Sequence, residues 1–153
     1  MSYIESHLLE NEEIIFKSQL HWVIFTQPLA WLIVSLSIHF LYLQSILFTS
    51  IPLLIFAIFG ISTAIIYLSS EFAVTNKRIL IKQGFIYIDS IDTFLSKIAS
   101  IQVHQSILGR LLNYGTIIII GTGSTRDLFP NIDNPFELRK HVQAQIEKLN
   151  IHG

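Results

Sequence analysis

The sequence predicts an α+β fold in which a two-helix transmembrane hairpin is followed by a small antiparallel β domain that one C-terminal helix closes. Three observations lead to this fold class. The window from Trp22 to Ser70 contains no Asp, Glu, Lys or Arg, although the chain carries 10 basic and 11 acidic residues. Apolar residues alternate after this window, and an apolar repeat of helical spacing ends the chain. We therefore expect an N-terminal segment over 1–21, the hairpin over 22–70 and the domain over 71–153.

The uncharged window is long enough for two membrane crossings. A helix needs roughly 20 apolar residues to cross a bilayer, and we place the crossings at 22–42 and 51–68. A polar break lies between them, formed by Gln44, Ser45, Thr49 and Ser50. Pro52 then falls in the first turn of the second helix, where proline is tolerated, and Pro28 bends the first crossing or marks its entry. The acidic stretch before Trp22 argues against a secretory signal peptide, which begins with a short basic region.

The basic residues near the ends of the crossings predict the orientation. Lys17 precedes the first crossing, and Lys77, Arg78 and Lys82 follow the second, whereas the connecting turn has none. Cytoplasmic loops of membrane proteins carry an excess of Lys and Arg. Both termini and the domain are therefore expected on the cytoplasmic side.

The segment after the window predicts short antiparallel strands. Its alternating residues are β-branched or aromatic and are interrupted by turns at Asn76 and Gly84. They are Phe72, Val74, Ile79, Ile81, Phe85, Tyr87, Ile91, Phe94, Ile98, Ile101 and Val103. Thr116–Ile120 is a β-branched run that we expect to form a central strand covered on both faces, although periodicity alone leaves a buried helical segment open. Arg126–Phe129 is the expected return strand, ending at Pro130.

The chain ends in a predicted amphipathic helix. Asn134 can cap this helix, Pro135 suits its first position, and Glu137 occupies the position of a capping-box side chain. One face of the helix is apolar and carries Leu138, Val142, Ile146 and Leu149. Such a face needs a sheet to cover it, so the helix is expected to close the open end of a small, strongly bent sheet.

Three blocks of the sequence resemble a known family. They are Glu-Phe-Ala-Val-Thr-Asn-Lys-Arg at 71–78, Leu-Ser-Lys-Ile at 95–98 and Gln-Ser-Ile-Leu-Gly-Arg-Leu-Leu-Asn-Tyr-Gly-Thr at 105–116, followed by Gly-Thr-Gly at 121–123. In this order behind a two-helix anchor, they are similar to the bacterial pleckstrin-homology (PH) family of the second type, the YdbS-like membrane proteins. The resemblance implies a PH-like fold of two packed antiparallel sheets with a C-terminal helix. It also implies a multi-pass protein of the bacterial inner (cytoplasmic) membrane that has no enzyme activity.

The sequence offers little to support catalysis or ligand chemistry. Gly121–Arg126 superficially suggests a phosphate loop, but it lacks the Gly-Lys-Ser/Thr ending and precedes a strand, so a hairpin turn is expected. The chain has no cysteine, and its six histidines are too widely separated for the spacing of metal ligands. The net charge of −1 gives no basis for nucleic-acid binding. We therefore expect no enzyme activity, no cofactor, no bound metal and no nucleic-acid partner.

The function expected from these features is that of a non-enzymatic interaction or scaffold module at the cytoplasmic face of the membrane. The candidate partner-binding residues are Arg110, Tyr114 and Arg126, and the expected partner is a membrane protein or a second copy of the chain. The leucines around Arg110 are expected to plug the sheet, because apolar residues in small domains usually belong to the core. They are Leu108, Leu111 and Leu112. The alternative is that Arg110 and Tyr114 among these leucines form a surface patch for a partner or for lipid headgroups.

Two alternatives remain open at the level of sequence. The first is binding of anionic lipid headgroups through the basic residues Lys77, Arg78, Lys82 and Lys97, although a positive-inside bias also explains the first two. The second is a small oligomeric transporter component. It is remote, because polar residues along the crossings are few and scattered.

Overall fold

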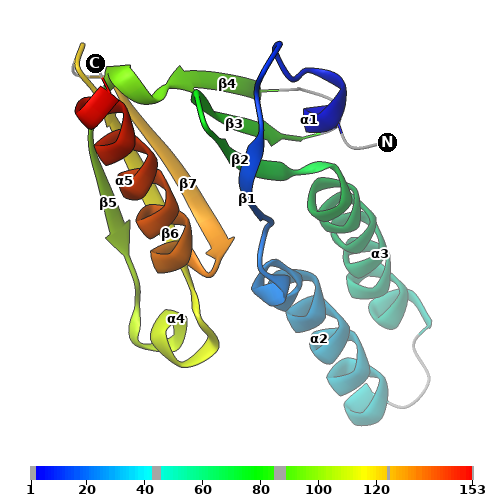
Figure 1. Ribbon diagram of the computed structural model, residues 1–153. Helices are drawn as coiled ribbons and strands as arrows, with labels where there is room; N and C mark the ends of the chain where they lie inside the picture. Colours follow the sequence, from blue (N-terminus) through cyan, green and yellow to red (C-terminus); the bar gives the residue numbers. More distant parts are fainter. Residues whose placement is uncertain (1–2, 43–45, 85–88, 124, 153) are drawn as a thin grey trace. The chain divides into compact units, whose positions relative to one another are not determined.

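The computed structural model describes residues 3–42, 46–84, 89–123 and 125–152 (Figure 1). They form two compact units. One is a β domain made of Met1–His21 together with Ser69–Gly153, and the other is a helical unit made of Trp22–Leu68. The N-terminal residues, expected to form a separate segment over 1–21, therefore belong to the same compact unit as the C-terminal half of the chain.

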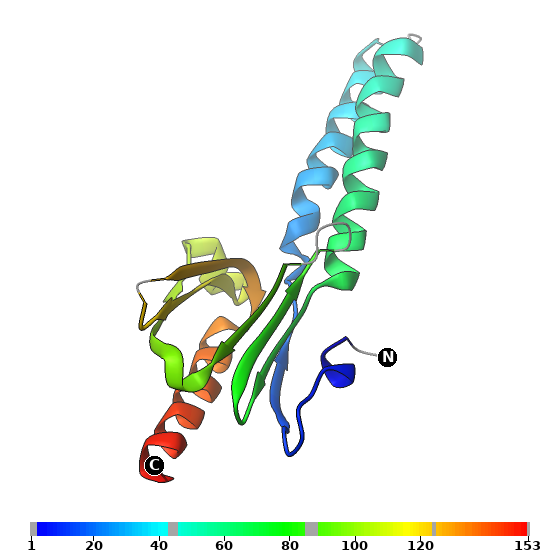
Figure 2. The same ribbon diagram turned by 90° about the horizontal axis from the view of Figure 1, so that it is seen from above.

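The helical unit consists of one short and two long helices. A 3-10 turn, η1 (Trp22–Phe25), leads into α2 (Thr26–Tyr42), and α3 (Ile46–Ser69) lies beside α2 in both views (Figures 1 and 2). Two spans are long and apolar enough to cross a membrane: Trp22–Leu41, with a mean hydropathy of 1.6, and Ser50–Ser69, with 2.4. Only 11% and 6% of these spans are buried.

The start of the second long helix differs from the expectation. Thr49 and Ser50, predicted to lie in the polar break, are helical, and Pro52 lies inside α3 rather than in its first turn. Proline removes the N–H that would bond to the carbonyl four residues earlier, and such a loss is tolerated in apolar helices when the freed carbonyl is satisfied locally. The other two residues of the predicted break, Gln44 and Ser45, lie outside the described residues. Pro28 lies in the first turn of α2, so it marks the entry to the first helix.

Four antiparallel strands form the first sheet of the β domain. They are β1 (Ile14–Ser18), β2 (Glu71–Thr75), β3 (Arg78–Gln83) and β4 (Asp89–Phe94), in that spatial order. The meander β2-β3-β4 agrees with the predicted one up to Phe94, with Phe85 and Tyr87 outside the described residues. The prediction is wrong for Ile98, Ile101 and Val103, which belong to a strand of the second sheet. Strand β1 was not predicted from the sequence. It pairs with β2, for example Ser18 with Phe72, although the whole helical unit separates the two strands in the sequence.

Three antiparallel strands form the second sheet. They are β5 (Ile98–His104), β6 (Tyr114–Gly121) and β7 (Arg126–Asp133), with β6 in the centre. Three consecutive isoleucines of β6, Ile117 to Ile119, are buried. The predicted central strand, covered on both faces, is therefore confirmed.

The return strand β7 continues past Pro130, where the sequence predicted its end. Two residues, Pro130 and Asn131, face the single residue Thr116, and Asn131 has a φ of 58°. This is a β-bulge, in which one strand carries an extra residue. Proline is tolerated there because bulges and edge strands do not need its missing N–H for the ladder.

The C-terminal helix α5 (Pro135–His152) contacts β1 and β2 of the first sheet and β5 and β6 of the second (Figure 2). Leu138 and Val142 of its apolar face are buried and Ile146 is half-buried, whereas Leu149 is exposed. Burial of this face between the two sheets explains why the helix closes the domain.

The start of α5 differs in detail from the predicted capping box. Asn134 has a left-handed φ of 48°, and its side chain bonds to those of Asp133, at 2.8 Å, and Asn113. The carboxylate of Glu137 lies 3.6 Å from Nζ of Lys140. Asn134 therefore precedes the helix as expected, but its side chain connects the helix to the loop before β6.

Candidate functional site

The conspicuous motif around Arg110 folds into a short helix, α4 (Ile107–Leu112), between β5 and β6 (Figure 1). Both ends of α4 are fixed by hydrogen bonds. The Oγ of Ser106 accepts from the N–H of Gly109 at 3.0 Å, and Asn113 ends the helix with a left-handed φ of 61°. The Nε2 of Gln105 donates to the carbonyl of Tyr114 at 3.0 Å. These bonds hold a helix that is too short to be stable alone.

A close backbone contact fixes the face that α4 turns toward the domain. A Cβ at Gly109 would lie 2.6 Å from the carbonyl oxygen of Tyr114, a distance that Cβ atoms essentially never show. Gly109 is buried. The backbone of α4 therefore rests directly on the start of β6, and only glycine allows this approach.

The large apolar residues of α4 point away from the domain. Ile107 is 89% exposed, Leu108 62% and Leu111 80%, whereas Leu112 is half-buried. The expectation that Leu108 and Leu111 plug the sheet is wrong, because Gly109 occupies the inward face and leaves no room there for a side chain. The three exposed residues span about 100° of the helix circumference, and Arg110 is exposed beside them.

The start of β6 also contacts the residue that precedes the helical unit. The ring of Tyr114 stacks on that of His21, with 5.1 Å between the ring centroids. The N–H of His21 donates to the carbonyl of Asn131 at 2.7 Å, and Leu20 pairs with Ile132. The segment Leu20–His21, which leads into Trp22, is therefore fixed at the same end of the second sheet as α4.

The structure brings together two of the three predicted partner-binding residues. Tyr114 pairs with Asp133 at one end of the β6–β7 hairpin, and Arg126 pairs with Ile120 at the other. Six residues of strand separate the two ends by about 20 Å. Arg110 and Tyr114 thus lie at one end of the β6–β7 hairpin, and Arg126 lies at the other.

Arg78, predicted to bind lipid, is instead the centre of a buried ion-pair network. Its side chain is only 9% exposed, and its Nε and Nη2 donate to Glu12 at 2.9 and 3.0 Å. Its Nη1 donates to Asp92 at 2.9 Å. The carboxylate of Glu12, fully buried, also accepts from the Thr75 hydroxyl and the Leu9 N–H. The network fastens the N-terminal segment to β2, β3 and β4.

Within this network, the buried charges of Arg78 and Glu12 stabilise each other. Burial alone raises the pKa of the Glu12 carboxyl, but hydrogen bonds from Arg78, Leu9 and Thr75 outweigh it and hold that pKa below its ordinary value. The hydrogen bond to Glu12 raises the pKa of Arg78. A charge held in this way serves stability, not lipid recognition.

The three lysines predicted to join Arg78 lie apart. Lys77 donates to the carbonyl of Glu10 at 2.6 Å, beyond one end of β3, whereas Lys82 lies near the other end, opposite Glu71. The ammonium of Lys97 lies 6.0 Å from the ring centroid of Phe94. The four basic residues therefore do not form one headgroup-binding surface.

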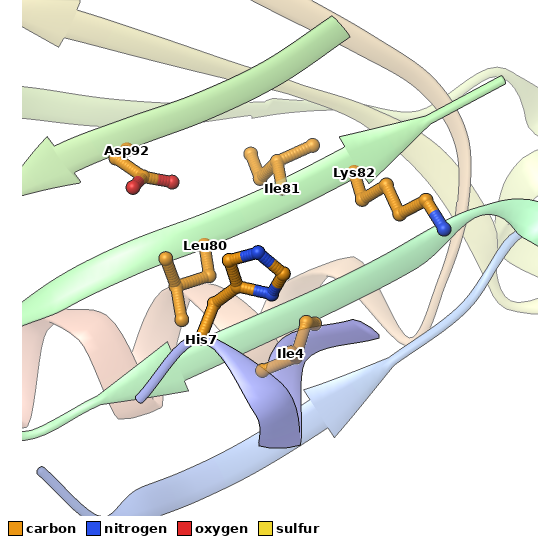
Figure 3. Close-up of a pocket in the computed structure, with 6 residues that line it drawn as sticks. All are labelled: Ile4, His7, Leu80, Ile81, Lys82 and Asp92. Atoms are coloured by element: carbon orange, nitrogen blue, oxygen red, sulfur yellow. The ribbon is translucent and has the colours of Figure 1, made fainter. Parts of the chain in front are cut away.

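A small cavity lies between the N-terminal helix α1 (Tyr3–Ser6) and the first sheet (Figure 3). It is lined by Ile4, His7, Leu80, Ile81, Lys82 and Asp92. Its volume of about 30 Å³ holds about two water molecules. Pockets for organic ligands are roughly ten times larger, so this cavity is not a substrate site.

Sequence reasoning named Arg110 and Tyr114 but missed the exposed apolar surface beside them. A signal for it is present: Ser106 is a helix-capping residue, and it stands directly before an apolar run interrupted by glycine. His21 was also missed. Its role depends on a stacking contact with a residue far away in the sequence, which no local pattern reveals.

The protein consists of two antiparallel sheets, a C-terminal helix that contacts both, and a pair of apolar helices. Its class is therefore a β module joined to a helical hairpin. A family model described as bacterial PH domain matches residues 19–146, a range that includes both apolar helices and β2 to β7. The chain belongs to the bacterial PH domain family. Neither the curated proteins nor the solved structures include a significant match to it.

Proposed function

We propose that the chain is an integral membrane protein whose two apolar helices cross the bacterial inner membrane and hold a non-enzymatic PH-like domain at its cytoplasmic face. The observation that carries the proposal is the exposure of these helices. Their candidate spans are 11% and 6% buried, whereas a core helix of a soluble protein is mostly buried. In water this apolar surface would be costly, and a bilayer removes the cost.

The orientation follows from the basic residues that flank the helices. Lys17 precedes α2, and Lys77, Arg78 and Lys82 follow α3. The positive-inside bias then places both termini and the β domain in the cytoplasm. Ion pairing within the folded β domain does not remove this bias, because the positive-inside bias acts while the chain is being inserted into the membrane.

Membrane integration can be tested on the full-length protein. The wild-type protein should stay in the membrane pellet after extraction with alkaline carbonate. Ile58→Arg places a charge in the middle of α3, which opposes insertion by about 3 kcal/mol, and should shift protein into the soluble fraction. Leu9→Arg, at an exposed leucine of the β domain, is the control. Release of the wild-type protein by carbonate would contradict the proposal.

The domain acts, in this proposal, as an interaction or scaffold module. Three features support this role: membership of the PH family, a buried charge network that serves stability, and surfaces that expose apolar side chains. Anchoring confines the domain to the membrane surface, which raises its effective concentration for other membrane proteins.

We assign the protein partner, a membrane protein or a second copy of the chain, to the surface around Arg126. Arg126 and Leu128 are both exposed on β7, an outer strand of the described second sheet. Outer strands present unpaired backbone groups and are common sites of association. This surface also lies far along the strand from the end that leads to the membrane helices.

A photo-crosslinking residue at Arg126 tests this assignment in native membranes. It should give a discrete protein adduct that disappears when Leu128→Asp is added, while the same probe at Lys140, exposed on α5, gives none. An adduct that persists with Leu128→Asp, or equal adducts from both positions, would remove Arg126 from the binding surface.

A further inference from the structure

Helix α4 presents an apolar surface on a rigid base. Ile107, Leu108 and Leu111 are 62–89% exposed. The helix beneath them is fixed by the Ser106 cap and by the contact of Gly109 with the carbonyl of Tyr114. Exposed apolar side chains grouped in this way mark an interaction surface, and the fixed backbone means that no ordering is needed before they bind.

The position of α4 indicates which surface it meets. Tyr114, two residues after α4, stacks on His21, and His21 is joined directly to Trp22, the first residue of the candidate span Trp22–Leu41. A membrane that takes up this span therefore begins one residue from a side chain packed at the base of α4. Trp22 is exposed, and tryptophan and tyrosine are the residues enriched at the membrane–water interface.

The charge on α4 itself fits a bilayer with anionic lipids. Between Lys97 and Arg126 the sequence contains one Asp, Glu, Lys or Arg residue, which is Arg110. Arg110 is exposed and lies beside the apolar residues on the helix. An apolar face flanked by a cation is the arrangement of segments that lie in the membrane interface, where the cation meets lipid phosphates.

We propose that α4 docks on the bilayer, with Ile107, Leu108 and Leu111 inserted among the headgroups and Arg110 on anionic lipid phosphates. This rests on the proposed function, because the hairpin must bring the β domain to the membrane. The docked helix adds a contact beyond the hairpin and fixes the orientation in which the domain presents its other surfaces.

The chain lacks cysteine, so a single introduced cysteine can carry an environment-sensitive fluorophore. The full-length protein with labelled Leu111→Cys is reconstituted in vesicles of phosphatidylcholine and phosphatidylglycerol, with or without lipids that carry a nitroxide quencher. Emission from position 111 should be blue-shifted and quenched by these lipids. A label at Gln143→Cys, exposed on α5, should show neither change.

Arg110→Gln tests the role of the cation. It should lower the ratio of inserted to uninserted α4 about fivefold in vesicles with phosphatidylglycerol, and it should have little effect in phosphatidylcholine alone. Equal quenching of Leu111→Cys with and without this substitution would remove Arg110 from the docking contact.

A third label separates failure of this inference from failure of the proposed function. Leu54→Cys in α3 should be quenched if the hairpin crosses the bilayer. Quenching at position 54 without quenching at position 111 would overturn the docking of α4 and leave the anchor intact. Absence of quenching at position 54 would overturn the anchor itself. A label at position 111 that is blue-shifted but not quenched would show that α4 is covered by protein, which also overturns the inference.

Discussion

Glu12 and Arg78 show how two single residues hold distant parts of this chain together. They are 66 positions apart in the sequence, and the helical unit lies between them. The charge pair is buried, so removal of Glu12 leaves Arg78 with only the half-exposed Asp92 as a counterion, and removal of Arg78 leaves the Glu12 carboxylate without its cation. The N-terminal segment and the strand pair β2–β3 therefore depend on each other for stability.

Glu12→Gln should destabilise the β domain by about 3 kcal/mol, because it leaves the Arg78 guanidinium buried without its main counterion. Thermal unfolding of the purified full-length protein in detergent, followed by near-UV circular dichroism, measures the effect. Glu10→Gln, which changes an exposed carboxylate nearby, should leave Tm unchanged. Equal Tm values for the two variants would show that the pair does not stabilise the domain.

The same carboxylate predicts how stability depends on pH. The pKa of Glu12 is lowered in the folded protein, so between the folded and unfolded pKa values the unfolded state binds more protons. The stabilising contribution of the Glu12 carboxylate is fully present above its ordinary pKa of 4.5, and it is lost as pH falls through the pKa of the folded protein. Tm should therefore decrease in acid below about pH 4.5. The decrease should be smaller in Glu12→Gln, and identical pH profiles would contradict this origin.

At the scale of elements, α4 depends on one glycine. Gly109→Ala would place a Cβ 2.6 Å from the carbonyl oxygen of Tyr114, so the helix must shift from β6. We expect a loss of about 1–3 kcal/mol, as for other overpacked sites. Gly123→Ala, where a Cβ meets nothing within 4 Å, is the control. Equal Tm values for both variants would show that α4 does not rest on β6 as described.

The elements also show what a local pattern can predict. Strand β6 and helix α5 were predicted because each carries its own periodicity and boundary residues, such as the β-branched run of β6 and Pro135 at the start of α5. Strand β1 was not, because its role depends on pairing with β2 across the whole helical unit. The extension of β7 beyond Pro130 depends on a bulge against β6, which is likewise a property of the pair.

The candidate site was predictable only in part, because the sequence does not show which of its side chains are buried and which are exposed. Apolar residues were expected in the core and charged residues on the surface, yet Leu111 is exposed and Arg78 is buried. In each case a contact that apolar periodicity does not reveal decides the burial. The carbonyl of Tyr114, five residues after Gly109, excludes side chains from the inner face of α4, and Glu12, 66 positions away, neutralises Arg78.

At the scale of the whole molecule, the chain combines a structured β domain with two helices that expose apolar surface. The residues that the family model matches, 19–146, include most of the β domain and both helices. In the proposed function the domain works through what its surfaces contact. The proposed contacts divide these surfaces between the bilayer, at α4, and a protein partner, at Arg126.

The membrane topology of the full-length protein tests the proposed transmembrane hairpin. A single cysteine is placed at Phe48, an exposed residue near the start of α3, or at Gln143 on α5. Both variants are then treated with a membrane-impermeant maleimide in intact spheroplasts and after lysis. We predict that Phe48→Cys reacts in intact spheroplasts and that Gln143→Cys reacts only after lysis. Reaction of Gln143→Cys in intact spheroplasts, or of both positions only after lysis, would contradict a transmembrane hairpin with a cytoplasmic domain.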